Sequence, residues 1–294
     1  DGREEEPGCR LSGNLTYPSA VISLALVILV DLDQHDRKGR PAPFPLRRPV
    51  SDLLAERGPA GQIGGCVLVH GWSCDGSDWA WQIPALKAAG YRCITPDLRG
   101  HGRSSVPAGG YTPRQYAADL AGLIGQLGCG PVVAIGHSMG GATVVALAVE
   151  HPEVVRAVVP VDSAYGFESE TAVTLPQMTQ AFRGPGGHDV ALQFASAAFY
   201  GPATPAHLPP LHARRIAAFD QEVMAAALEG LILPADQFGE KPRSEMYLRR
   251  VAAPALAFRA GRNDPASMAA WERAQFQHPK SKAIGWEGTG HWLH

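Results

Sequence analysis

The chain has 294 residues, which is enough for one large domain or at most two small ones. Its 45% apolar and 18% charged residues are typical of a globular protein and exclude a disordered or coiled-coil chain. The 26 basic and 28 acidic side chains leave a net charge of −2, so we expect no nucleic-acid partner. The five cysteines form no C-x-x-C or Cys/His cluster along the sequence. This predicts reduced thiols, no metal site and a cytoplasmic enzyme or binding domain.

The first part of the chain, residues 1–61, is predicted to be an extension with leading strands. Residues 20–30 (AVISLALVILV) form the longest apolar run, but at 11 residues it is about half the length of a membrane span. We therefore predict a buried strand there and no membrane span. Asn14 begins a glycosylation sequon of a kind that often arises by chance. The proline-rich residues 31–62 are expected to form a surface connection.

Short apolar runs alternate with helix-like stretches through the middle of the chain. The predicted strands are residues 66–69, 91–95, 131–135, 154–161 and 254–260. The predicted helices are residues 79–89, 113–127 and 139–150. This alternation is typical of an α/β protein whose parallel sheet is covered by helices on both faces. Such sheets bind ligands at the carboxyl ends of their strands, where the polar residues of this sequence fall.

The third predicted strand is followed by Gly136-His137-Ser138-Met139-Gly140, a G-x-S-x-G sequence that leads directly into an apolar helix. A sharp turn from strand to helix needs small neighbours and strains the central residue. It also lifts the serine hydroxyl out of the sheet, at the positive end of the helix. The setting therefore predicts Ser138 as a nucleophile.

With further motifs in the same order, the chain resembles the α/β-hydrolase superfamily from about residue 62 to its C-terminus. The further motifs are His70-Gly71-Trp72 and the segments 96–104 (PDLRGHGRS), 261–265 (GRNDP) and 290–292 (GHW). The resemblance implies an α/β-hydrolase fold, with a mostly parallel central sheet, helices on both faces and an inserted helical cap. The order of serine, then aspartate, then histidine is also that of this superfamily.

The resemblance divides the chain into a core of residues 62–163 and 251–294 and a cap, or lid, of residues 164–250. Cap helices are expected at about residues 188–200, 212–230 and 243–251. Only three residues follow His291, where the family usually adds a final helix. We expect that helix to be absent from this chain or to be supplied differently.

A serine nucleophile needs a base, and the base needs a carboxylate that orients it and stabilises its charge. The resemblance implies His291 as the base, with His294 as the fallback. It implies Asp264, after the strand at 254–260, as the acid. Asp162, at the end of the strand at 154–161, is the alternative acid, because some family members take theirs from that position.

Two backbone N–H groups are needed to stabilise the oxyanion of an acyl-transfer reaction. The resemblance places them on Trp72, after the His-Gly pair, and on Met139, after the nucleophile. The neighbouring His70 is expected to bond the loop backbone. His101 and Arg103 are expected to fix the loop after the second strand. None of these last three residues is assigned to catalysis.

The candidate substrate pocket combines aromatic residues of the core and the cap. The candidates are Trp79, Tyr165, Phe167 and Phe199. An apolar lid with few charges suits a small hydrophobic ester or lactone. Such a reaction needs no cofactor and no metal.

The predicted function is therefore hydrolysis of a carboxylic ester or lactone through a Ser-His-Asp triad and an acyl-enzyme. Haloalkane dehalogenases and epoxide hydrolases need an aspartate where this chain has Ser138. A cofactor-free haloperoxidase or perhydrolase keeps the serine triad and stays an alternative. So does a ligand receptor that retains the triad without turnover. The sequence predicts neither the natural substrate nor the oligomeric state.

Overall fold

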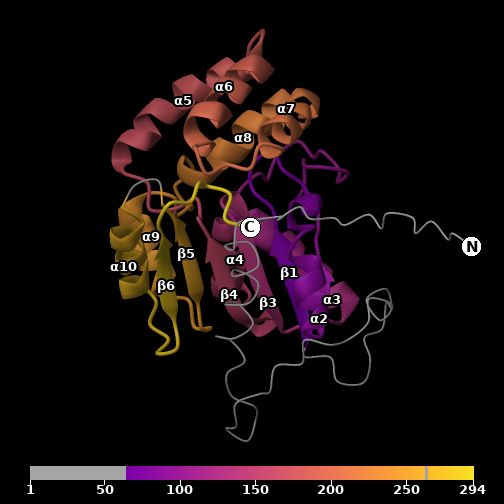
Figure 1. Ribbon diagram of the computed structural model, residues 1–294, viewed down its shortest axis with the longest axis vertical. Coiled ribbons are helices and arrows are strands. Elements are labelled where there is room, and N and C mark those ends of the chain that lie inside the picture. Colours follow the sequence, from indigo (N-terminus) through magenta and orange to yellow (C-terminus); the bar gives the residue numbers. More distant parts are fainter. Residues whose placement is uncertain (1–63, 262–263) are drawn as a thin grey trace, which may run out of the picture.

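The computed structural model describes residues 64–261 and 264–294 (Figure 1). The predicted extension, with its strand at residues 20–30, its surface connection at 31–62 and the sequon at Asn14, lies outside the described residues.

The described part of the chain contains one six-stranded parallel sheet in the order β2-β1-β3-β4-β5-β6. Its strands are β1 (Gly64–Val69), β2 (Tyr91–Ile94), β3 (Val132–His137), β4 (Val155–Val161), β5 (Leu256–Ala260) and β6 (Lys282–Trp286). The first five confirm the predicted strands to within two residues, and the predicted parallel sheet is confirmed. This order places β3 and β4 side by side in the middle, so residues just after them meet at the centre of the carboxyl edge.

Alternate strand residues pack into two separate hydrophobic layers, because neighbouring side chains of a strand point to opposite faces. Val67 and Val69 lie in one layer, whereas Cys66 and Leu68 lie in the other, and all four are fully buried. Helices α3 (Pro113–Leu127), α4 (Met139–Glu150) and α10 (Pro265–Gln275) cover the first face, and the short α2 (Ile83–Ala88) contributes to the second. Two 3₁₀ segments, η2 (Gly76–Trp79) and η3 (Pro152–Val154), complete the core connections.

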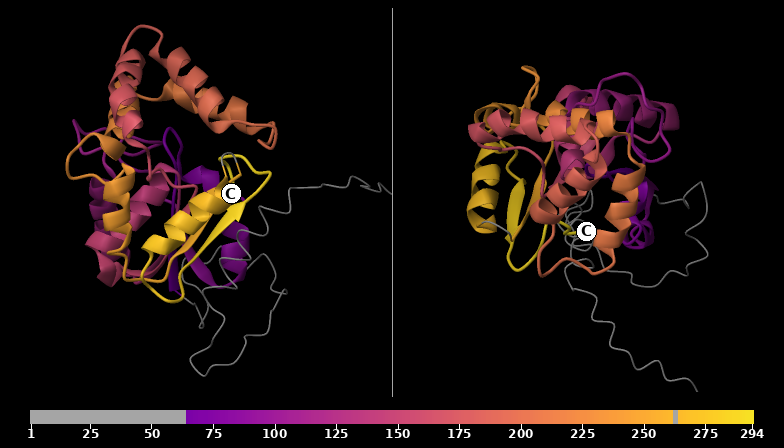
Figure 2. Two further views of the ribbon diagram at one scale, coloured as in Figure 1. Left: turned by 90° about the vertical axis from the view of Figure 1, so that its left-hand side faces the viewer. Right: turned by 90° about the horizontal axis from the view of Figure 1, so that it is seen from above.

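Five helices are inserted between β4 and β5: α5 (Ser169–Arg183), α6 (Gly187–Phe199), α7 (Leu208–Ala218), α8 (Gln221–Ile232) and α9 (Lys241–Leu248). Helices α5 to α8, which we call the cap helices, lie together above the sheet in Figure 1 and project beyond the core in the left view of Figure 2. Helix α9 instead contacts α10 in the core. The cap boundaries at residues 164 and 250 stay a prediction.

The cap differs from the prediction in two helices. The stretch predicted as one helix over residues 212–230 is two, because Asp220 begins α8 by accepting a hydrogen bond from the Val223 N–H at 3.0 Å. Helix α5 was not predicted, and it contains Pro176 in its interior. It is held to α8 by ion pairs from Arg183 to Glu222 and Glu229. Tertiary contacts therefore stabilise a helix that local propensity disfavours.

No helix in the described ranges combines the length and the apolar character that a membrane span requires.

Candidate active site

Ser138 occupies the sharp turn between β3 and α4, with φ 54° and ψ −117°. The glycines around it are required by close approach. A β-carbon at Gly136 would lie 2.1 Å from the Gly140 carbonyl oxygen, and one at Gly140 would lie 2.2 Å from the Val69 carbonyl oxygen. The G-x-S-x-G spacing thus allows the tight turn that presents the Ser138 side chain above the sheet.

The register of β3 and β4 brings Asp162 beside the serine. His137 pairs with Val161, the last residue of β4, and the Ser138 N–H donates to the Val161 carbonyl at 2.9 Å. Asp162 is the next residue and also has a positive φ of 40°. The ends of two adjacent central strands therefore present a hydroxyl and a carboxylate at one place.

Asp162 makes the polar contact that fixes His291. Its Oδ2 lies 2.5 Å from the His291 Nδ1, and its Oδ1 accepts from the Ala260 N–H at 3.1 Å. Burial alone raises the pKa of Asp162, but the hydrogen bond from His291 and the charges of His291 and Arg259 outweigh it, so this pKa lies below its ordinary value. The carboxylate is therefore ionised and oriented toward the imidazole.

The prediction that Asp264 partners His291 is wrong. Asp264 is exposed and caps α10, where its carboxylate accepts from the Ser267 N–H at 3.0 Å. An aspartate followed by Pro265 at the first helical position is an ordinary helix-start pattern. That pattern was a readable signal for a capping role, and the structure puts the alternative acid, Asp162, at the histidine.

His291 is enclosed by aromatic and imidazole rings. Phe199 from the end of α6 stacks on it with a centroid distance of 4.8 Å and an interplanar angle of 21°. The His137 Nε2 donates to the His291 carbonyl at 2.8 Å, which holds the backbone of the loop. The fallback base, His294, lies 4.3 Å from the His137 ring and does not line the cavity that contains Ser138.

The loop after β1 packs directly against the sharp turn that carries Ser138. A β-carbon at Gly71 would lie 3.3 Å from the Ser138 Cβ, which places the following Trp72 next to the serine. His70 fixes this loop, since its Nδ1 donates to the Gly71 carbonyl at 2.8 Å and its Nε2 accepts from the Leu98 N–H at 3.0 Å. The predicted backbone role of His70 is confirmed.

The loop after β2 has the fixed structure that its motif predicts. Arg103 donates from its backbone N–H and its Nε to the Asp97 Oδ2, at 3.0 and 3.1 Å. The fully buried His101 donates from Nδ1 to the Arg99 carbonyl at 3.0 Å. These residues therefore stabilise the loop, as expected.

A cavity of about 610 Å³ connects the site to the cap. Ser138, Asp162 and His291 line it together with Trp72 and Met139. Three of the four pocket candidates, Tyr165, Phe167 and Phe199, also line it, and further apolar lining comes from Leu175, Met178, Phe194, Leu228, Leu231, Ile232 and Met268. The site thus opens into a largely apolar chamber between core and cap.

The fourth pocket candidate, Trp79, is placed elsewhere. It is fully buried in the hydrophobic layer on the opposite face of the sheet, with its ring 4.5 Å from that of His294. Trp72 takes the position at the cavity instead. Its ring stacks on Phe182 at 5.9 Å, and its Nε1 donates to the Met224 carbonyl of α8 at 2.8 Å.

The buried ion pair between Arg259 and Glu272, whose arginine acts on Asp162, was not predicted from the sequence. Arg259 of β5 donates from Nε to the Glu272 Oε2 at 2.8 Å and from Nη1 to the Ser163 carbonyl at 2.8 Å. Tyr165 donates to the other oxygen of Glu272. The available signal was a single arginine in the apolar run at residues 254–260, because a charge in a buried strand requires a partner.

A serine at a nucleophile elbow and an adjacent Asp-His pair, on the carboxyl edge of a parallel sheet, define the class of α/β hydrolases. A family model described as the alpha/beta hydrolase family matches residues 66–294. The chain therefore belongs to the alpha/beta hydrolase family.

Comparisons with individual proteins give relatives of several activities. The chain is 43% identical over 82 residues to a non-heme haloperoxidase of Rhodococcus erythropolis, a match that spans 28% of this chain and only 30% of that relative. A thermophilic esterase from Thermogutta terrifontis is 26% identical, with a TM-score of 0.65 over 79% of this chain and 84% of that one. The enol-lactonase from Burkholderia xenovorans LB400 is 23% identical, with a TM-score of 0.66 over 79% and 85% of the two chains, a likeness of fold alone.

Proposed function

We propose that this chain is a serine hydrolase that cleaves a carboxylic ester or lactone through an acyl-enzyme. The observation that carries the proposal is the 2.5 Å contact between the His291 Nδ1 and the Asp162 carboxylate, in the cavity that Ser138 also lines. This is the arrangement in which a carboxylate orients an imidazole for a serine nucleophile.

In the proposed reaction the Ser138 hydroxyl attacks the substrate carbonyl while the His291 Nε2 takes its proton. Asp162 holds the imidazole in the tautomer that accepts at Nε2 and stabilises its positive charge. The backbone N–H groups of Trp72 and Met139 stabilise the oxyanion, each by about 3 kcal/mol. His291 then returns the proton to the leaving alcohol, and water releases the acyl group from Ser138 by the same steps.

The cavity supports a substrate with a hydrophobic acyl or alcohol part. Its volume of about 610 Å³ is in the range of small-molecule sites, and its walls are mostly apolar and aromatic. We propose that Tyr165, Phe167 and Phe199 contact this part of the substrate. The esterase named among the similar structures is consistent with such a substrate.

A panel of p-nitrophenyl esters and lactones tests the proposal. Wild type is expected to hydrolyse short or medium esters, and Ser138→Ala is expected to lose several orders of magnitude in kcat/KM. Ser196→Ala, at an exposed position of α6, is the matched control and is expected to keep full activity. Equal hydrolysis by wild type and Ser138→Ala would mean that Ser138 is not the nucleophile.

A second candidate function is favoured by the similarity to the haloperoxidase. In that reaction the same Ser138 and His291 would convert a carboxylic acid and hydrogen peroxide into a peracid and water. The peracid would then oxidise halide to hypohalous acid and return to the carboxylate. Bromination that depends on added carboxylate, and that exceeds ester hydrolysis by the same preparation, would favour this function. The remaining alternative is a ligand receptor that retains the triad without turnover. A ligand that binds tightly to both wild type and Ser138→Ala and is not turned over would favour it.

A further inference from the structure

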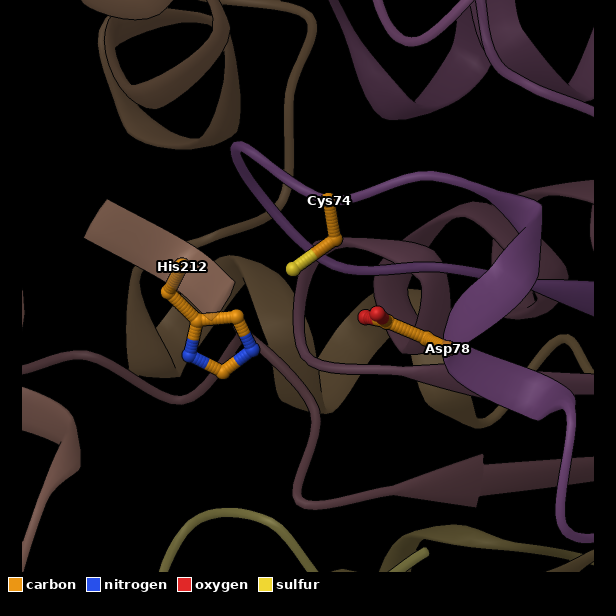
Figure 3. A group of neighbouring side chains, drawn as sticks. All are labelled: Cys74, Asp78 and His212. Carbon is orange, nitrogen blue, oxygen red and sulfur yellow. The ribbon is translucent and has the colours of Figure 1, made fainter. Parts of the chain in front are cut away.

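A second group of chemistry-bearing side chains lies between the core and the cap. Cys74 comes from the loop after β1, Asp78 from η2 and His212 from the cap helix α7. Each offers a ligand atom, and these atoms all lie within 4.8 Å of one another. Figure 3 shows the Cys74 sulfur, the Asp78 carboxylate and one ring nitrogen of His212 directed toward a common point.

Asp78 and His212 each have one polar atom that is engaged by a neighbouring side chain and a second polar atom that faces the cluster. Asp78 accepts from Arg215 at Oδ1, and its carboxylate is also in hydrogen-bonding contact with the Cys74 thiol, whereas the buried Oδ2 has no nitrogen or oxygen donor. The His212 Nδ1 contacts the Tyr200 hydroxyl at 3.0 Å, whereas its Nε2 is buried without a partner. Because Nδ1 is engaged by Tyr200, the nitrogen that faces the cluster in Figure 3 is Nε2. Leaving buried polar atoms unpaired costs about 1–3 kcal/mol each, so this pair of atoms calls for a ligand.

We propose that Cys74, Asp78 and His212 form a binding site for a divalent transition-metal ion such as Zn²⁺. A thiolate, an imidazole nitrogen and a carboxylate oxygen are the three ligand types that zinc takes in proteins. Metal-bound histidines also hydrogen-bond through their second nitrogen, as His212 does with Tyr200. Arg215 holds Asp78 in the same way from outside the cluster.

The local charges fit a dication. Arg215 pairs with Asp78 and also with Asp75, at 3.0 Å between its Nε and the Asp75 Oδ2. Two carboxylates and one guanidinium leave one negative charge. Binding of the metal releases the Cys74 thiol proton to solvent, and the resulting thiolate brings the total to two negative charges. A divalent ion therefore makes the cluster neutral.

The cluster is separate from the proposed hydrolytic site. Cys74 is 3% exposed and is absent from the residues that line the substrate cavity, so its sulfur is not placed to attack a substrate there. The position of the cluster indicates a bracing role instead. Cys74 and Asp78 belong to the core, whereas His212 belongs to the cap and packs 4.1 Å from the ring of Trp292, which follows His291. A bound ion would tie α7 to the core next to the histidine loop.

Metal content and affinity test the proposal on the full chain. We expect the chelator-treated protein to bind one equivalent of Zn²⁺, measured by titration and elemental analysis. Cys74→Ser is expected to weaken binding by about 100-fold or more, because even the loss of a partner outside the ligand set costs about 10- to 100-fold. Cys129→Ser and His291→Ala are the controls, and both are expected to bind zinc like wild type. Binding that survives Cys74→Ser, or that is lost in His291→Ala, would overturn the proposal.

X-ray absorption on zinc-loaded wild type keeps the test independent of how the variants fold. One sulfur ligand at about 2.3 Å together with nitrogen or oxygen ligands at about 2.0–2.2 Å is the expected result. A zinc shell without sulfur, or failure of the wild-type protein to hold one equivalent, would overturn it. Zinc is also expected to raise the Tm of wild type and not that of Cys74→Ser, since an ion that binds only the folded state stabilises it.

Discussion

Strands β4 and β5 are neighbours, and each is followed by an aspartate with a positive φ, yet the two carboxylates have opposite surroundings. Asp162 contacts the His291 imidazole at 2.5 Å, whereas Asp264 is exposed and caps a helix. Asp162 directly follows β4, the strand next to the one that ends just before Ser138, whereas Asp264 comes four residues after the end of β5 and begins α10. An aspartate near the end of a strand can therefore either orient a histidine or cap the next helix, and its hydrogen-bond partners distinguish the two roles.

The largest expected effect separates these two aspartates directly. Asp162→Asn should lower kcat/KM for ester hydrolysis by about 10³- to 10⁴-fold, because an amide no longer favours the tautomer that accepts at Nε2. Asp264→Asn should keep kcat/KM within about twofold of wild type. Steady-state kinetics of both variants decide the matter. A large loss in Asp264→Asn with a small one in Asp162→Asn would reverse the assignment.

The next effect concerns the buried ion pair between Arg259 of β5 and Glu272 of α10. Glu272→Ala removes the partner of the buried Arg259 and should lower the free energy of unfolding by about 3–5 kcal/mol, measured by urea denaturation. The double variant Arg259→Met/Glu272→Leu removes both charges and should recover most of that loss. Equal destabilisation in the single and double variants would show that the pair is not coupled.

A smaller effect concerns the pH dependence of the free energy of unfolding, which involves three buried histidines. His70, His101 and His137 are fully buried, and burial lowers the pKa of all three, that of His101 to about 3. Below an ordinary pKa of about 6.5 the unfolded chain binds protons that the folded chain refuses. The free energy of unfolding should therefore fall as the pH drops below about 6.5, by up to about 1.4 kcal/mol per pH unit for His101 down to about pH 3, and the other two histidines act in the same direction.

Urea denaturation between pH 7.5 and pH 5 measures this slope. His101→Phe has a side chain that cannot take up a proton and should reduce the slope by one histidine's share, whatever its effect on stability at pH 7.5. An unchanged slope in His101→Phe would contradict the assignment.

The smallest effect belongs to the exposed aspartate alone. Asp264→Ala removes the cap of α10 and should lower the free energy of unfolding by about 1 kcal/mol. Asp264→Ser keeps a side chain that can cap the helix and is the matched control. Thermal denaturation of the two variants, with ester hydrolysis measured alongside, completes the comparison. A loss of activity larger than the loss of stability would indicate a further role for Asp264.

The parts of the molecule that depend on local sequence were predictable. The apolar runs gave the strands to within two residues, and the glycines around Ser138 reflect atomic clearances that any chain with this turn must satisfy. The position of His70 against its own loop was predictable for the same reason. Contacts within one turn or loop can therefore be predicted from the residue types of that segment.

The sequence did not show which distant segments contact one another. The spacing of Asp162 and Asp264 along the chain does not show which of them contacts His291, because that contact joins segments far apart in the sequence. Trp79 faces away from the cavity because of the side of the sheet on which η2 packs. The cluster of Cys74, Asp78 and His212 combines two core residues with one residue of the cap. The expectation of no metal site was based on spacing along the sequence, which does not show such a cluster.

The hydrogen bond from the Trp72 indole to the Met224 carbonyl has a consequence for exchanging caps between relatives. Trp72 belongs to the loop that carries a proposed oxyanion donor, and Met224 belongs to α8 of the cap. A transplanted cap that fills the same volume but offers no carbonyl there would leave the indole N–H buried and unpaired. A chimera built on this core is therefore expected to be more stable when the backbone of its new cap offers a carbonyl to Trp72.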